Sequence, residues 1–370
     1  MTVLLTGAGG FLGWHIRCRA AAEGITVVPA PKGWVDDPSI LDKLLPGVTG
    51  VIHAAGVNRG SDDELIKGNE TAAGSLARAL RRVDRSVDVV YANSSQAGST
   101  SVYGRAKARG AELLSAASSR FTLHDVRLAN LFGEHGRPDY NSFIATFCHR
   151  LIADEPLEIV DDREVPLLHV QDAARYLLSL ATQARPRLSA PTPEVKTVSE
   201  VRRFLTSCAV TYQTGEIPAT DGRLERQLFS TFRSFCFPSW YPMAATPKSD
   251  SRGRLVECVR TRASEGQIFV STTVPEAVRG EHYHLRKMER FMVIEGEATI
   301  TLRRLFTNHK VRFRVNGAQP AIVDMPCMWT HNICNGSAEV VTTLFWTDEL
   351  FDPASTDTYA CPVDSTELAA

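Results

Sequence analysis

Short apolar runs alternate with longer segments of helical pattern along the first part of the chain. Buried strands are expected at residues 3–5, 25–30, 51–52 and 87–91. Helices are expected at residues 11–22, 41–45, from about 64, 143–152 and 198–208. This alternation predicts an α/β fold built on a doubly wound parallel sheet.

The pattern changes after about residue 243. Short alternating runs, broken by Gly, Pro and Asn, are typical of an antiparallel barrel and occur at residues 254–259, 267–273, 290–294, 298–302, 311–315 and 340–345. An aromatic-rich stretch, residues 229–242, precedes the change and is expected to lead into a linker. Because 370 residues exceed one ordinary core, we expect two domains, 1–243 and 244–370.

A glycine-rich turn follows the first apolar run. Gly7 would allow a sharp exit from the strand, Gly10 would let a pyrophosphate approach the backbone, and Gly13 would let the helix pack on the sheet. Phe11 and Leu12 would open that helix, whose N-terminus favours phosphate. The turn therefore predicts a dinucleotide site of the Rossmann type.

The segments after the next two strands indicate which dinucleotide binds and where it lies. No Asp or Glu ends the run at 25–30, and Lys32 offers a cation that suits the 2′-phosphate of NADPH, although a solvated lysine explains it equally well. The small residues Ala54, Ala55 and Gly56 leave a buried strand and would let the cofactor lie against the backbone.

A tyrosine and a lysine four residues apart indicate the chemistry of this half. Tyr103 and Lys107 would lie on one helix face and beside the cofactor, so the ammonium could lower the pKa of the phenol and hold the nicotinamide ribose. Tyr103 would then act as the acid or base for a carbonyl oxygen, oriented by a serine that ends the preceding strand. Position favours Ser94 over Ser95.

Three histidines and a glutamate in the second half form a candidate metal site. His282 and His284 would point to one side of a strand, and Glu289 and His331 would complete the ligand set. Unpaired inward-facing histidines are costly to bury, which favours a metal such as zinc over a purely structural role. Zinc there could be catalytic or could hold the barrel closed.

Overall charge and cysteine usage limit the partners. The net charge is −1 and the pI is about 6.8, so a nucleic-acid or anionic-membrane surface is not expected. The eight cysteines contain no C-x-x-C pair, and most are expected to be reduced and buried. No apolar stretch approaches membrane-spanning length and no signal peptide precedes the first strand, so we expect a cytoplasmic protein.

The two halves resemble two known families. TGAGGFLG, the H-x-A-G stretch and YGRAK resemble extended short-chain dehydrogenase/reductases. The histidine segments resemble the two cupin motifs, although Met328 stands where a glycine is expected. Over nearly the whole chain, the segments DYNSFIATFC, GEHYH, ELFDP and DTY make it similar to bifunctional capsular polysaccharide enzymes.

That resemblance implies a function and further site residues. The cupin domain would epimerise C3 of a UDP-linked 4-keto-6-deoxy-hexosamine, and the reductase domain would reduce C4 with NADPH. Asn130 and Arg163 would bind the nucleotide sugar, and Asn69 would tether the adjacent loops. The cupin base stays open between Tyr283, Tyr359 and a metal-bound water.

Departures from the family pattern keep other readings open. Tyr283, Leu285 and Arg105 differ from the residues expected at those positions, which leaves room for another nucleotide-linked ketosugar, such as one in secondary metabolism. A metal-dependent cupin with a non-catalytic Rossmann domain and a binding protein without turnover are the alternatives from other classes. A homodimer is expected, because barrels of this type often pair through strands.

Overall fold

The computed structural model describes residues 1–83, 86–182, 188–251, 253–262 and 266–365. They form two compact units, an N-terminal unit of Met1–Thr146 and Asp161–Val198, and a C-terminal unit of Phe147–Val160 with the chain from Ser199 onward. Contacts therefore group residues 199–243 with the barrel. The sequence domains 1–243 and 244–370 remain a proposal.

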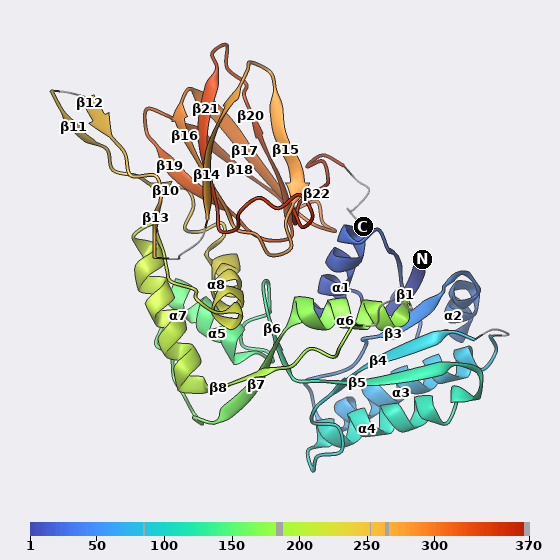
Figure 1. Ribbon diagram of the computed structural model, residues 1–370. Coiled ribbons are helices and arrows are strands. Elements are labelled where there is room, and N and C mark those ends of the chain that lie inside the picture. The colour runs from blue at the N-terminus through green and yellow to red at the C-terminus, as the bar shows by residue number, and fades with distance from the viewer. Residues whose placement is uncertain (84–85, 183–187, 252, 263–265, 366–370) are drawn as a thin grey trace. The chain divides into compact units, whose positions relative to one another are not determined.

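A five-stranded parallel sheet is the centre of the N-terminal unit (Figure 1). The strand order is β2-β1-β3-β4-β5, and all four pairings are parallel. The strands are β1 (Thr2–Thr6), β2 (Thr26–Pro29), β3 (Gly50–His53), β4 (Asp88–Ser94) and β5 (Thr122–Leu128). The helices are α1 (Phe11–Ala22), α2 (Pro38–Leu44), α3 (Asp62–Leu80), α4 (Val102–Ser115) and α6 (Val170–Ala181).

Side-chain alternation along the strands builds a separate core on each face of this sheet. Leu4 and Val89 belong to a cluster with α2, α3 and α4, whereas Leu5 and Val90 belong to a cluster with α1 and α6. A sheet covered on both faces is what the continuous apolar runs predict. A smaller sheet, β6 (Asn130–Phe132), β7 (Glu164–His169) and β8 (Glu194–Thr197), lies beside this core.

Two antiparallel five-stranded sheets form most of the C-terminal unit (Figure 1). One has the order β10-β19-β16-β21-β14, with β10 (Met243–Ala244), β19 (Ala321–Met325), β16 (Glu289–Glu295), β21 (Val341–Thr347) and β14 (Gln267–Thr273). The other has the order β18-β17-β20-β15-β22, with β18 (Lys310–Asn316), β17 (Glu297–Arg304), β20 (Trp329–Cys334), β15 (Val278–Tyr283) and β22 (Tyr359–Ala360).

Helices and short strands complete the described elements. The helices α7 (Val198–Gln213) and α8 (Arg223–Cys236) belong with the barrel, and α5 (Phe143–Ile152) spans a unit boundary. The minor strands are β9 (Glu216–Ile217), β11 (Lys248–Asp250), β12 (Gly253–Leu255) and β13 (Arg260–Thr261).

The first part of the aromatic-rich stretch 229–242 belongs to a helix that the sequence pattern did not reveal, because α8 extends to Cys236 and buries Phe229 and Phe232. One sequence expectation is wrong here. The expected strand at 254–259 is limited to β12, which pairs only with β11.

A buried network of charged and aromatic side chains joins α7 and α8 to the barrel. Arg290 on β16 makes a bidentate ion pair with Asp324 on β19, at 2.7 and 2.9 Å, and both side chains are at most 2% exposed. Tyr212 on α7 donates to Asp324, and Arg233 on α8 donates to Tyr212 at 3.2 Å. Because buried charges are stable only when paired, barrel and helices depend on one another.

No helix among the described residues combines the length and the apolar composition that a bilayer crossing requires.

Candidate active site and metal centre

The turn between β1 and α1 has the geometry of a dinucleotide cradle. Gly7 has φ +74°, and a Cβ there would lie 2.6 Å from the backbone of Ala54. A Cβ on Gly13 would lie 2.1 Å from the Gly7 carbonyl oxygen. Gly10 is the N-cap of α1 and supplies no side-chain cap, and the first turn carries no acidic residue. The helix N-terminus therefore suits a phosphate, as a dinucleotide cofactor requires.

Thr6 and Asn69 hold the segment that follows β3 beside this cradle. Thr6 Oγ1 lies 2.6 Å from His53 Nδ1 and accepts the Ala55 N–H at 3.3 Å. Buried Asn69 donates to the carbonyls of Val57 and Leu65, both at 2.8 Å, so it ties the loop to α3. The structure thus shows the tethering that the resemblance implied for Asn69.

Tyr103 and Ser94 meet at the carboxyl end of the sheet. Ser101 caps α4 by accepting the Gly104 N–H at 3.0 Å, which begins the helix one residue before Tyr103. The side chain of Ser94, at the end of β4, lies close enough to the Tyr103 hydroxyl to act on its pKa through hydrogen bonding. Burial raises the pKa of Tyr103, and this hydrogen bond opposes the rise. A neutral phenol suits proton donation.

Lys107 does not lower the pKa of Tyr103 as expected. Its ammonium is buried, donates to the Ala92 carbonyl at 2.8 Å and lies 4.2 Å from the centre of the Tyr91 ring. Burial lowers the pKa of Lys107 to about 8, and the Asp125 carboxylate partly opposes this. Burial is therefore the largest influence on both pKa values, raising that of Tyr103 and lowering that of Lys107.

We expect ketone reduction to weaken as pH rises through about 8. Lys107 loses its charge there, and the hydrogen bonds that its ammonium donates weaken. A charge-assisted hydrogen bond contributes about 1.5–3 kcal/mol, so removal of the ammonium in Lys107→Met should lower kcat/KM about 10- to 100-fold. The pH profile of kcat/KM, measured for both proteins, checks this. A decline near pH 8 that persists in the variant would assign that titration to another group.

Asp125 and Asn93 support Ser94, a role that sequence inspection missed. Asn93 donates to Asp125 on β5 at 2.7 Å and accepts the Ser94 N–H at 2.8 Å. Nothing in the local sequence marks this pair, because β4 and β5 are far apart in the chain. The pair fixes the end of β4 where Ser94 is presented.

The remaining expected residues of the N-terminal unit are dispersed. Lys32 is exposed just after β2. Asn130 donates to the Pro166 carbonyl at 3.2 Å, whereas exposed Arg163 pairs with Asp161 at 3.4 Å. Asp172 lies in the first turn of α6, whose N-cap is His169. A role for Asn130 and Arg163 in substrate binding therefore stays a prediction.

The four expected metal ligands converge between the two sheets of the C-terminal unit. One ligand atom from each of His282, His284, Glu289 and His331 lies within 4.8 Å of the others. Glu289 Oε2 lies 3.8, 3.0 and 3.3 Å from the Nε2 atoms of His282, His284 and His331, respectively. Both sheets supply ligands, since Glu289 begins β16 and His331 lies on β20.

The hydrogen bonds of the imidazoles show that this cluster fits a cation. His284 Nδ1 lies 2.6 Å from the Asp357 carbonyl and His331 Nδ1 lies 3.4 Å from the Trp329 carbonyl, so each Nδ1 carries the proton. Each Nε2 then presents a lone pair and has no hydrogen-bond partner. Lone pairs facing the Glu289 carboxylate repel unless a cation lies between them.

The protonation of the cluster agrees with metal binding. Burial lowers the pKa of His331 to about 4, so this imidazole is neutral. Neutral imidazoles and a carboxylate are the ligand forms that Zn²⁺ takes.

Tyr283 is a poor candidate for the cupin base. It alternates with His282 along β15 and so points to the opposite side of the strand. Its side chain is buried and its ring packs on Tyr359 of β22 at 5.3 Å. Neither tyrosine is among the residues that converge on Glu289.

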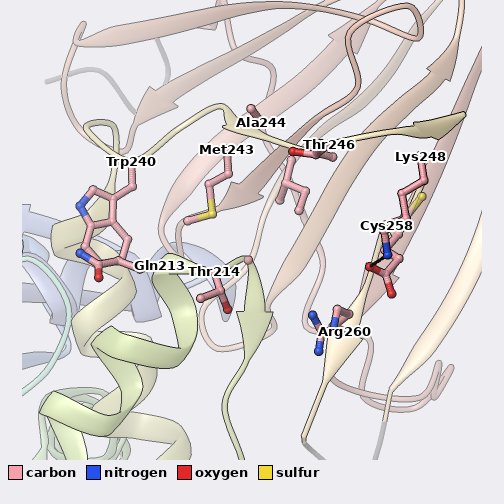
Figure 2. Close-up of a pocket in the computed structure, with 13 residues that line it drawn as sticks. Gln213, Thr214, Trp240, Met243, Ala244, Thr246, Lys248, Cys258 and Arg260 are labelled. Atoms are coloured by element: carbon pink, nitrogen blue, oxygen red, sulfur yellow. Dashed lines mark ion pairs between the residues drawn. The ribbon is translucent and has the colours of Figure 1, made fainter. Parts of the chain in front are cut away.

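A hollow that contains none of these residues lies elsewhere in the C-terminal unit. Figure 2 shows this cavity of about 550 Å³, with Trp240 and Met243 on one side and Lys248 and Arg260 on the other. Its cations are already paired, Lys248 with Glu257 at 3.8 Å and Arg260 with Glu216 at 2.7 Å. None of the expected site residues lines it, so its size does not make it the reaction site.

Comparisons with known proteins match a different family model to each half of the chain. Residues 1–195 match the RmlD substrate binding domain, and residues 248–359 match the polysaccharide biosynthesis C-terminal domain. The chain is 33% identical to the UDP-2-acetamido-2,6-beta-L-arabino-hexul-4-ose reductase of Pseudomonas aeruginosa, over 98% of this chain and 99% of that protein. A dTDP-4-dehydrorhamnose reductase of Mycobacterium tuberculosis is 28% identical over 48% of this chain and 65% of its own length.

A solved structure extends the likeness over both units. The capsular polysaccharide assembling protein CapF from Staphylococcus aureus has a TM-score of 0.61 and 28% identity, covering 98% of this chain and 100% of that one. The expected fold class, a Rossmann-type parallel sheet followed by an all-β cupin barrel, is confirmed. The chain therefore belongs to the family of bifunctional capsular polysaccharide synthesis enzymes, nicotinamide-dependent oxidoreductases that modify nucleotide sugars.

Proposed function

We propose that the chain converts a UDP-linked 4-keto-6-deoxy-hexosamine in two steps. The C-terminal domain would epimerise C3, and the N-terminal domain would then reduce the C4 ketone with NADPH. The activity named for the Pseudomonas aeruginosa relative, reduction of a UDP-linked hexul-4-ose, supports this substrate class. The observation that carries the proposal is the grouping of Ser94, whose backbone Asn93 holds, with Tyr103 of the helix that also carries the buried Lys107.

The residues of the N-terminal unit suit ketone reduction. NADPH, held at the Gly7–Gly13 turn with Lys32 near its 2′-phosphate, would supply hydride to C4. Ser94 would hold the ketone oxygen, and Tyr103 would donate the proton to it as negative charge develops. Asn93 and Asp125 keep Ser94 in place.

The C-terminal unit suits the epimerisation, because the C3–H bond is acidic beside a C4 ketone. His282, His284, Glu289 and His331 would hold a divalent metal, zinc by its ligand types, which would supply a Lewis acid. The C3–H bond breaks, its electron pair moves toward O4, and the proton leaves to a base that exchanges with water. A proton returns to C3 from the opposite face, so no oxidant or reductant is consumed.

Deuterium exchange with simultaneous NADPH oxidation tests both steps. The protein is incubated in deuterated water with NADPH and the 4-keto-6-deoxy product of UDP-GlcNAc. We expect deuterium at C3 and loss of absorbance at 340 nm. Exchange without NADPH oxidation would contradict the reductase step, and oxidation without exchange would contradict the epimerase step. If both signals are absent, the substrate is another nucleotide-linked ketosugar, which is the alternative that the departures at Tyr283 and Leu285 leave open.

A homodimer and a cytoplasmic location belong to the same proposal. The edge strand β14 pairs only with β21 in its sheet and exposes Ile268 and Val270, each 58% exposed, which supports pairing with a second copy. A monomeric mass in light scattering would remove the dimer. The location rests on the use of a nucleotide sugar and NADPH.

A further inference from the structure

The C-terminal strap, residues 349–359, has no role in the function proposed so far. It contains the ELFDP and DTY segments that the resemblance singled out. In the structure it packs against residues 285–287, between the paired histidines and Glu289. Arg286 makes a bidentate ion pair with Glu349 at 3.0 Å for each bond, and Lys287 donates to the Thr356 carbonyl at 3.2 Å.

Asp357 of the strap connects it to a metal ligand. Its carboxylate is buried and accepts the N–H groups of Leu285, Arg286 and Lys287 at 3.3, 2.9 and 2.8 Å. Its main-chain carbonyl accepts from His284 Nδ1 at 2.6 Å. This bond fixes the tautomer that aims Nε2 at Glu289, which is the usual task of an outer-shell partner of a metal-binding histidine.

The strap also borders a pocket of about 220 Å³ that reaches Glu289. Lys287, Phe269, Phe351 and Thr356 are among the residues that line it. Pockets for drug-sized ligands measure about 300–1,000 Å³, so this one suits a single sugar ring with the nucleotide outside.

An aromatic wall leads from this pocket to the metal ligands. Phe269 stacks on Phe345 at 4.9 Å, Phe345 packs on Phe291 at 4.4 Å, and Phe291 packs on His331 at 5.7 Å. The pocket therefore lies on the inner face that carries the cluster.

Glu289 divides the pocket from the cluster. Its Oε2 faces the three imidazoles, whereas its Oε1 lies 3.6 Å from Lys287 Nζ, and the Lys287 side chain is only 13% exposed. A mostly buried ammonium that lines a pocket beside a candidate metal is suited to bind an oxygen on which negative charge develops.

We propose that the strap completes the sugar site of the metal centre. The pocket takes the keto-sugar ring of the nucleotide sugar, Lys287 binds the ketone oxygen next to C3, and Asp357 is a positioning residue for His284. This inference rests on the proposed epimerisation and adds the residues that would confine and bind the sugar.

Lys287→Met tests the sugar contact through the rate of C3 deuterium exchange. A lost charge-assisted hydrogen bond predicts a fall of about 10- to 100-fold with unchanged metal content, and Lys287→Arg should recover part of the rate. Lys310→Met, which removes a partly buried lysine of β18 that pairs with Asp364 in the same barrel, is the matched control. Wild-type exchange in Lys287→Met, or metal loss in parallel with the rate, would overturn the contact. Absence of exchange in the wild type would instead refute the proposed epimerisation, and with it this inference.

Asp357→Ala tests the positioning role through metal affinity. Asp357→Ala keeps the main-chain carbonyl that meets His284 but removes the carboxylate that fixes this carbonyl against residues 285–287. Misplacement of an outer-shell partner should weaken metal binding about 10- to 100-fold, and Asp357→Asn, which keeps an oxygen acceptor for the N–H groups, should recover much of it. Zinc competition with a chromophoric chelator measures this for folded protein, as judged by circular dichroism. Equal zinc affinity in wild type and Asp357→Ala would overturn the role.

Discussion

Replacing Tyr103 with Phe should nearly abolish ketone reduction while leaving cofactor binding intact. The variant keeps the ring but removes the hydroxyl that meets Ser94, so the developing alkoxide has no proton donor. Positioned general acids contribute about 10²- to 10⁴-fold, and kcat should fall by that factor. Steady-state assays of NADPH oxidation measure kcat, and fluorescence titration measures NADPH affinity.

Tyr91→Phe is the matched control for this experiment. Tyr91 also contacts Lys107, through its ring at 4.2 Å and a hydrogen bond of 3.5 Å to the Lys107 carbonyl, but its hydroxyl does not meet Ser94. We expect nearly wild-type kcat for this variant and unchanged C3 exchange for both. A kcat within a few-fold of wild type in Tyr103→Phe would show that another group donates the proton.

Removing His282 should release the metal and stop the epimerisation without unfolding the barrel. His282 is the most exposed of the four ligands, at 22%, so its loss leaves the smallest void. A ligand that binds only the native state stabilises it by about 4 kcal/mol when present at 1,000 times its Kd. His282→Ala should therefore lose zinc, C3 exchange and the thermal stabilisation that added zinc gives the wild type.

His309→Ala serves as the control, since His309 is exposed and packs on Trp329, away from the four ligands. Elemental analysis of the purified proteins and thermal scans with and without a chelator provide the readouts. Zinc at the wild-type level in His282→Ala would exclude this residue as a ligand. Exchange that survives complete zinc removal would make the metal structural.

Local pattern was enough to find several elements with their exact bounds. Residues 11–22 and 267–273 match a helix and a strand of the structure residue for residue. Helix α8 was missed, because its apolar stripe is interrupted by polar residues such as Arg233. That side chain is buried only because Tyr212 and the Met325 carbonyl accept its hydrogen bonds, and such partners from distant segments cannot be recognised locally.

The same distinction holds for the sites. The spacing of His282, His284 and Glu289 is local, so the metal cluster was predictable, whereas the contact of Asp357 with His284 spans 73 residues. The pKa of Tyr103 was predicted in the wrong direction. Helical spacing placed Lys107 nearby, but only the fold shows that the Ala92 carbonyl holds the ammonium and that burial dominates.

The buried network around Asp324 bears on how such a two-part enzyme can be taken apart. Recombination or truncation at residue 244 would keep Arg290 and Asp324 but remove Tyr212 and Arg233, and it would uncover the face of β16 and β19 that α7 and α8 protect. The transferable module is therefore the barrel together with its two helices. A gene fragment inherited without residues 199–243 would encode a barrel with an unshielded ion pair on its surface, so the fusion of the two activities is hard to undo.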